Sequence, residues 1–213
     1  MIKIESFVFN MFYENTFVVS DDSKECVIID PGCYSQHERD KLSRYISRQG
    51  LKPVHLLNTH CHIDHVFVNR FVADTWNLKL TIPDGEQSVL DAFPKISEMY
   101  AIPNIQQSPD PEIILFENDI VKFGNTTMKV ISAPGHSPGG ICFYLEDEKI
   151  LIAGDVIFED SIGRTDLPGG NHNLLIQNIK TKILTLPEDV QIYCGHGNST
   201  TVGKEKRYNQ FLR

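Results

Sequence analysis

Histidine and aspartate side chains are concentrated in one short stretch of the chain. His60, His62, Asp64 and His65 lie within six residues, directly after the apolar run 54–57. That run has the length and composition of a buried strand. Side chains two apart in an extended segment point to the same side, so His60 and His62 can bind one ion. If a helix follows, Asp64 and His65 turn to a different direction and can bind a second ion.

The ligand types define the chemistry that this stretch can support. Neutral imidazole nitrogens and carboxylate oxygens suit zinc, iron or manganese. The alternative is a solvated polar loop that is rich in histidine. It does not explain the spacing, because such a loop has no reason to place histidines at alternate positions. Residues 59–65 therefore predict a metal site.

Four donors cannot complete two metal sites, so further ligands are expected elsewhere. Three later strands each end in a loop of small residues that carries one candidate. The candidates are His136 in the Pro/Gly loop 132–140, Asp155 after the apolar run 150–153, and His196 between Gly195 and Gly197. Small flanking residues let the backbone approach an ion closely. Loops at strand ends are also the usual place for catalytic groups.

The seven candidates divide between two ions. One metal takes His60, His62 and His136, the other takes Asp64, His65 and His196, and Asp155 bridges them. Each ion then stays open to a bridging water, which two cations make acidic enough to be hydroxide near neutral pH. Asp64 and Asp155 are accordingly the candidate catalytic carboxylates. No Ser-His-Asp set or thiolate nucleophile is needed.

Several other residues of reactive type are expected to stay outside the site. Cys61 lies between two ligands, but its side chain should point the other way along an extended segment. His37 and His55 have no neighbouring ligands, and His172 is expected at a helix start. An isolated histidine is more often a surface or core residue than a metal ligand.

Composition and charge restrict the class of partner. The chain has 213 residues, of which 41% are hydrophobic, and a net charge of -8, which argues against a nucleic-acid or anionic-membrane binder. No apolar run approaches the roughly 20 residues of a membrane span, and the first residues lack a signal-peptide pattern. Five scattered cysteines without a Cys-x-x-Cys pair favour a reducing compartment. We expect a cytoplasmic protein that acts on a small molecule.

The predicted elements place these loops on a β-rich scaffold. Strands are predicted over residues 2–9, 16–20, 26–29, 54–57, 79–81, 113–115, 120–123, 127–132, 141–145, 150–153 and 190–193. Helices are predicted over residues 36–49, 66–77, 85–93 and 173–186. Ser35 and Glu38 have capping-box spacing for the first helix, and Gly50 ends it. Prolines interrupt residues 94–112, which can form a lid or an ordered surface loop.

The strand order predicts the domain organisation. The strand–helix–strand unit around residues 26–57 implies a parallel pair of strands with helices packed on a sheet. The second half of the chain is also predicted to be rich in β-strands, and no linker or low-complexity tract separates the two halves. We expect one domain over residues 1–213, with two sheets packed face to face between helices.

The set of candidate ligands resembles that of the metallo-β-lactamase superfamily. The ligands follow in the same order along the chain: His60-x-His62-x-Asp64-His65, then His136, Asp155 and His196. The resemblance implies an α+β, four-layer αβ/βα sandwich of two mixed sheets. Within the superfamily, residues 158–170 and 195–206 are similar to the short glyoxalase II-like hydrolases. That likeness implies a metal-dependent thioesterase that acts on S-acylglutathione or another small thioester, with two divalent ions that are zinc, iron or manganese.

The sequence departs from full-length glyoxalase II enzymes after the last ligand. Those enzymes carry a C-terminal helical domain that binds glutathione, whereas only residues 197–213 follow His196 here, so no such domain is expected. Arg164 stands where a basic residue of that family contacts the substrate carboxylate, and it is a candidate substrate-binding residue. The alternative is a structural ion pair, for instance with Asp166.

Other functions compete with this hypothesis. Persulfide dioxygenases share the implied fold, bind one iron, and have similar stretches to residues 59–62 and 163–166. Against them, the presence of Asp64, His65 and His196 favours two metals. A nuclease or phosphodiesterase is disfavoured by the acidic balance and the lack of a basic insertion. A non-enzymatic binding role does not explain an intact ligand set.

Overall fold

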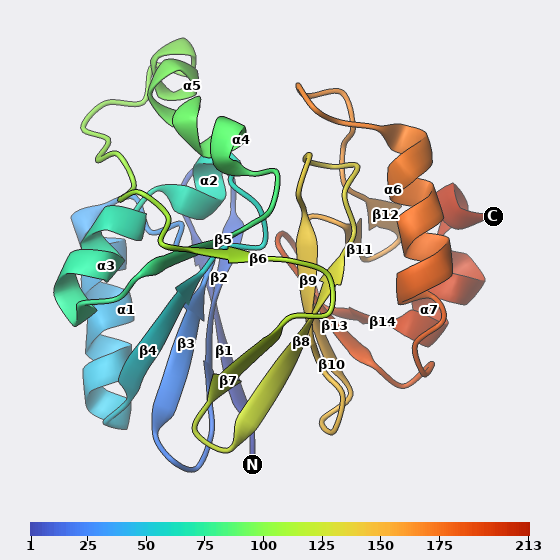
Figure 1. Cartoon of the computed structure of the whole chain (residues 1–213), viewed down its shortest axis with the longest axis horizontal. Coiled ribbons are helices and arrows are strands. Elements are labelled where there is room, and N and C mark those ends of the chain that lie inside the picture. Colours follow the sequence, from blue (N-terminus) through green and yellow to red (C-terminus); the bar gives the residue numbers. More distant parts are fainter. The chain divides into compact units, whose positions relative to one another are not determined.

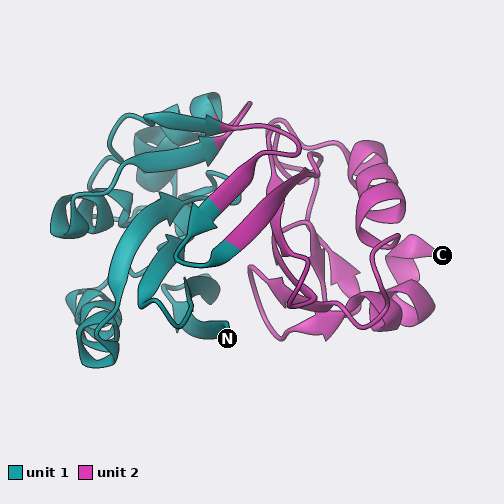
Figure 2. Cartoon of the chain, turned by 60° about the horizontal axis from the view of Figure 1, so that its bottom comes forward, with its two compact units in different colours: residues 1–82, 87–114, 122–126 teal, residues 83–86, 115–121, 127–213 magenta.

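The computed structural model describes all residues, Met1–Arg213. The chain forms two compact units, coloured separately in Figure 2. Unit 1 comprises residues 1–82, 87–114 and 122–126, and unit 2 comprises residues 83–86, 115–121 and 127–213. Two six-stranded mixed sheets with accompanying helices make up the fold (Figure 1), which confirms the predicted α+β class. None of the helices has the length and apolar character needed to cross a membrane.

The first six strands form one sheet in the order β1-β2-β3-β4-β5-β6. They are β1 Lys3–Phe9, β2 Glu14–Ser20, β3 Glu25–Ile29, β4 Lys52–Leu57, β5 Leu80–Pro83 and β6 Ile113–Leu115. Strands β1, β2 and β3 pair antiparallel, whereas β3, β4 and β5 pair parallel. A parallel pair needs a crossover connection, which helices provide on both sides of β4. This confirms the predicted strand–helix–strand unit.

Helix α1 Gln36–Gln49 has the predicted boundaries and caps. The Ser35 hydroxyl accepts the Glu38 N–H, and the Glu38 carboxylate accepts the Ser35 N–H at 2.7 Å. Gly50 closes the helix in the left-handed conformation at φ 62°. Leu42 and Ile46 are buried in a core that this helix shares with the strands. The local sequence therefore determines where α1 begins and ends.

The helix predicted over residues 66–77 is instead two helices. Helix α2 Ile63–Val66 begins directly after the histidine pair, and α3 Asn69–Trp76 follows. Val68 interrupts them with φ −126° and ψ 25°, and its N–H donates to the Pro31 carbonyl at 3.2 Å. The prediction was wrong here because a partner far away in sequence satisfies the backbone at the break. The early start of α2 makes Asp64 and His65 helical, as the two-ion hypothesis requires.

The proline-rich region also contains more helix than predicted. Helix α4 Gln87–Asp91 is followed by α5 Phe93–Met99, with Pro94 in its first turn, where a missing N–H costs nothing. The loop after α5 is fixed to unit 1 at several points. The Tyr34 hydroxyl donates to the Pro103 carbonyl at 2.7 Å, and Asn69 donates to the Ser108 hydroxyl at 3.2 Å. These bonds support an ordered surface loop rather than a free lid.

The second sheet has the order β14-β13-β10-β9-β8-β7. Its strands are β7 Ile120–Phe123, β8 Thr126–Ser132, β9 Ile141–Leu145, β10 Ile150–Gly154, β13 Gln191–Cys194 and β14 Thr200–Thr201. A small hairpin consists of β11 Ile157–Phe158 and β12 Ser161–Ile162. The later helical elements are α6 His172–Asn178, the π-helical turn η1 Ile179–Ile183, α7 Val202–Tyr208 and the 3-10 turn η2 Gln210–Leu212. The sequence did not predict β11, β12, β14 or α7, because segments this short carry no clear periodicity.

Candidate metal centre

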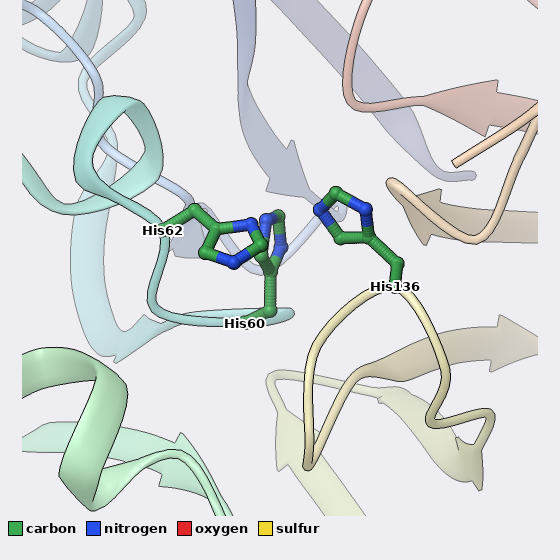
Figure 3. Close-up of side chains that lie close together, drawn as sticks. All are labelled: His60, His62 and His136. Atoms are coloured by element: carbon green, nitrogen blue, oxygen red, sulfur yellow. The ribbon is translucent and has the colours of Figure 1, made fainter. Parts of the chain in front are cut away.

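The loop after β4 presents two of the predicted ligands in unit 1. His62 has extended backbone angles, φ −64° and ψ 153°, and caps α2. The rings of His60 and His62 lie 4.8 Å apart between centroids and meet edge to face. Figure 3 shows both side chains projecting from this loop, and their ligand nitrogens lie within 4.8 Å of each other. That spacing is short enough for both nitrogens to bind one ion.

The first turn of α2 carries the next two predicted ligands. The Nε2 atom of His65 lies 3.7 Å from a carboxylate oxygen of Asp64. The His65 ring is completely buried, and its centroid lies 4.1 Å from that of His60. The two ligand pairs are therefore adjacent, although they belong to the extended and helical parts of one segment.

Asp30, at the end of β3, connects both ligand pairs. This residue is fully buried, and its carboxylate accepts the Thr59 N–H at 2.7 Å, the Thr59 hydroxyl at 2.6 Å and the Nδ1–H of His65 at 3.1 Å. Since the Thr59 hydroxyl gives its proton to Asp30, its oxygen accepts the Nδ1–H of His60 at 3.1 Å. Both histidines are therefore held with Nδ1 protonated and Nε2 as the lone-pair donor.

Sequence reasoning missed Asp30. It read the segment Asp30-Pro31-Gly32 only as the end of a strand, and a single aspartate before proline gives no other signal. Asp30 also lies close enough to His60 and His65 to be considered a metal ligand itself. Its oxygens already accept the bonds from Thr59 and His65, so we assign it to positioning these histidines.

The loops of unit 2 bring three more predicted ligands together. His136 lies between β8 and β9, as Figure 3 shows at the tip of its loop, Asp155 follows β10, and His196 follows β13. Strands β10 and β13 are parallel and pair Gly154 with Cys194, so Asp155 and His196 leave the sheet at the same edge. The Asp155 carboxylate oxygen lies 3.5 Å from Nε2 of His136 and 3.4 Å from Nε2 of His196.

The backbone of Arg164 orients His136. The Nδ1–H of His136 donates to the Arg164 carbonyl at 2.7 Å, which leaves Nε2 directed toward Asp155. The preceding residue has to be glycine, because a Cβ at Gly163 would lie 1.9 Å from the Asp155 carbonyl oxygen. A side chain at this position would displace the segment that holds His136.

The residues that sequence reasoning set aside lie elsewhere. Cys61 is buried in the core of unit 1. Nε2 of His55 lies 2.8 Å from the Lys122 carbonyl oxygen. His172 is the first residue of α6, and His37 is on α1; both are exposed.

The donor set fits divalent transition-metal ions. The ligand atoms are imidazole nitrogens and carboxylate oxygens, the types that zinc, iron and manganese accept. Three of the histidines direct their second nitrogen to an oxygen acceptor, namely Thr59, Asp30 and the Arg164 carbonyl. Metal-binding histidines almost always have such a partner, because it fixes the ring orientation and raises ligand basicity.

Comparison with known proteins identifies the family. Residues 10–196 match the sequence profile of the Metallo-beta-lactamase superfamily, and the chain belongs to this superfamily. The Hydroxyacylglutathione hydrolase GloC of Haemophilus influenzae is 34% identical, and the alignment covers 99% of this chain and 98% of that protein. The Probable metallo-hydrolase YqgX of Bacillus subtilis is 36% identical, with 92% and 90% covered.

Solved structures share the fold. The BLEG-1 B3 metallo-beta-lactamase has a TM-score of 0.89 and 36% identity, with 100% of this chain and 99% of that chain covered. TTHA1623 in a di-iron-bound form has a TM-score of 0.88 and 31% identity, with 98% and 100% covered. ETHE1 from Myxococcus xanthus, at 21% identity, a TM-score of 0.78, and 98% and 83% coverage, shows the likeness of fold alone. The predicted metallo-β-lactamase fold is confirmed.

The Asp30→Asn variant tests the role of Asp30. Asparagine offers one acceptor oxygen and an amide group that donates, so it cannot accept all the bonds from Thr59 and His65. We expect the affinity for zinc to fall about 10- to 100-fold, as measured by competition with a chelator of known affinity. The matched variant Asp74→Asn changes an exposed carboxylate and should bind zinc as the wild type does. Equal affinities for all three proteins would contradict this role.

A second buried carboxyl group, Glu14, lies close to α2, the helix that carries Asp64 and His65 and is called the ligand helix below. The Thr16 hydroxyl oxygen lies 2.9 Å from a Glu14 carboxyl oxygen, from the Asp30 carbonyl and from the Gly32 nitrogen. The carbonyl can only accept and the N–H can only donate, so one position on the hydroxyl oxygen remains for a proton donor. A protonated Glu14 fills it. Burial also raises the pKa of Glu14 well above its usual range.

The Glu14→Gln variant tests this protonation state. Unfolded Glu14 ionises near its ordinary pKa of about 4.3, whereas the folded chain favours the neutral form. The resulting stabilisation is complete below the unfolded pKa and is lost as pH rises through the raised folded pKa. Glutamine stays neutral, so we expect the variant to gain stability relative to wild type as the pH rises above the unfolded pKa of glutamate. Urea unfolding midpoints measure this, and a pH-independent difference would contradict it.

Proposed function

We propose that the chain is a dinuclear metal-dependent hydrolase. In this proposal, His60, His62 and His136 bind one ion, Asp64, His65 and His196 bind the other, and Asp155 bridges them. The observation that carries it is the fixed orientation of the imidazoles, since Thr59, Asp30 and the Arg164 carbonyl each occupy a second ring nitrogen. Zinc is the ion that we expect first, and iron is supported by the likeness to the di-iron form of TTHA1623.

The chemistry follows from the ligands. When bound, two divalent cations would acidify a water molecule and polarise the carbonyl oxygen of a substrate. The protein contributes rigid ligands: Asp30 holds His65 directly and His60 through Thr59, and Asp155 lies between His136 and His196. Asp64 and Asp155 are the proposed catalytic carboxylates, because they supply the negative charge that balances the cations.

We further propose that the substrate is a small thioester of the S-acylglutathione type. Support comes from the 34% identity to a hydroxyacylglutathione hydrolase along almost the entire length of both chains. The likeness to BLEG-1 favours a β-lactam as a second candidate substrate. Both substrates need attack on a carbonyl carbon, so the same ligand set serves either. For the alternative, a persulfide dioxygenase, the comparison with ETHE1 supports the fold alone.

An activity screen separates these possibilities. We expect zinc-loaded protein to hydrolyse S-lactoylglutathione and to lose the activity with a chelator. The His196→Ala variant should lose activity by on the order of 100-fold, whereas His172→Ala, at an exposed position, should not. Faster hydrolysis of nitrocefin than of any thioester would identify a β-lactamase. One iron per chain with oxygen uptake on glutathione persulfide would identify a dioxygenase, and inactivity on all of these substrates would refute the proposal.

Arg164 is the proposed anchor for a substrate carboxylate. Its guanidinium currently makes two bonds of 2.7 Å to Asp166, and this pairing lowers the pKa of Asp166 to about 2. Both side chains are more than half exposed, so the ion pair contributes little to stability and can open for a substrate.

Removing either partner of this ion pair should change KM in opposite directions. Arg164→Ala should raise KM for S-lactoylglutathione about tenfold, while kcat changes little because His136 uses the backbone carbonyl. Asp166→Ala should lower KM, since it releases the guanidinium. The matched control Arg207→Ala removes another exposed arginine paired with a carboxylate. A purely structural ion pair would instead give equal KM values in all the variants.

We also propose a cytoplasmic compartment and a small-molecule partner. All five cysteines are buried and form no disulfide. Burial raises the pKa of Cys26 and of Cys194 to about 12, so these thiols stay protonated and inert. The buried thiols support a reducing environment, and the net charge of -8 supports a small-molecule substrate rather than a nucleic-acid or anionic-membrane partner.

A further inference from the structure

Two segments without charged residues meet in unit 1. Residues 6–13 and 99–109 contain no Asp, Glu, Lys or Arg, although 23% of the chain is charged. The rings of Phe12 and Tyr100 lie 5.8 Å apart and meet edge to face. This contact brings the two uncharged segments together.

This surface exposes large apolar side chains. The exposed fractions are 49% for Met11, 72% for Tyr13, 76% for Met99 and 52% for Tyr100. Phe12 is half-buried and stacks on Phe67, with the two ring centroids 6.3 Å apart. We call Met11, Phe12, Tyr13, Met99 and Tyr100 the apolar rim. Single exposed apolar residues are normal, whereas several on two segments that meet can mark a binding surface.

The apolar rim is attached directly to the metal-ligand helix. The Asn10 side-chain amide donates to the backbone carbonyl of Asp64 at 3.1 Å and to that of Gly32 at 3.0 Å. The Asn10 side-chain oxygen in turn accepts the Phe12 N–H at 2.8 Å, which fixes the turn between β1 and β2. Phe67, on which Phe12 stacks, is the C-cap residue of α2. The rim is thus pre-formed beside two of the proposed ligands.

We propose that the apolar rim binds the acyl group of the substrate and selects thioesters with bulky apolar acyl chains over short hydroxyacyl chains. The inference rests on the proposed function for the bond that is cleaved. None of the five rim residues carries a positive charge, so the rim does not anchor the carboxylates of a glutathione moiety, the role proposed for Arg164. An apolar acyl chain, by contrast, gains free energy from each methylene that the rim buries.

Binding of non-hydrolysable thioethers tests the rim independently of catalysis. S-hexylglutathione should bind to the metal-loaded protein about tenfold or more tighter than S-methylglutathione, as measured by calorimetry. The double variant Tyr13→Ser/Met99→Ser replaces the two most exposed rim residues and should abolish this difference. The control Tyr208→Ser/Phe211→Ser removes two exposed aromatic residues of unit 2 and should retain it.

Hydrolysis then provides the second readout. The ratio of kcat/KM for S-hexanoylglutathione to that for S-lactoylglutathione should exceed about ten in the wild type and fall toward one in the rim variant. Equal affinities for both thioethers would overturn the rim proposal, whatever the protein hydrolyses. Tighter binding of the hexyl compound without hydrolysis of any thioester would leave the rim in place and refute the proposed function. Loss of self-association in the rim variant, with unchanged ligand preference, would identify a contact between copies of the chain and overturn the proposal.

Discussion

The buried carboxylate of Asp30 is the interaction on which the candidate metal centre depends. A buried charge is costly unless hydrogen bonds compensate it, and the compensating donors here come from the ligand segment itself. Thr59 and His65 both donate to Asp30, and His60 donates to Thr59. The end of one strand thus sets the orientation of two histidines proposed for different ions. A change at Asp30 would therefore act on both of the proposed ion sites.

In the loops of unit 2, backbone groups rather than a buried carboxylate orient the candidate ligands. His136 donates to the Arg164 carbonyl, and Gly163 lets this segment pass close to Asp155. The parallel ends of β10 and β13 bring Asp155 and His196 to one edge of the sheet. Backbone acceptors depend on the fold and not on side-chain identity, so the second half of the ligand set is built mainly by topology.

The surroundings of the ligand helix divide into a buried polar side and an exposed apolar side. Glu14 and Asp30 lie together in the interior, where a neutral Glu14 avoids a second buried charge beside the first. The turn that follows Asn10 faces solvent and carries three of the five residues of the apolar rim. Asn10 joins both sides, because its amide bonds to the carbonyls of Asp64 and Gly32. In our proposals, substrate selection and ligand positioning therefore share one short turn.

The sequence by itself determined what depends on neighbours along the chain. The cap residues of α1 are three residues apart, and the spacing of His60 to His65 alone defines a ligand pattern, so both were predictable. The break at Val68 and the roles of Asp30 and Glu14 were decided only by tertiary structure. Asp30 contacts His65 across 35 residues, and Val68 bonds to Pro31. Hydrogen bonds between residues so far apart produce no periodic pattern in the sequence, because the partners meet only once the sheet has formed.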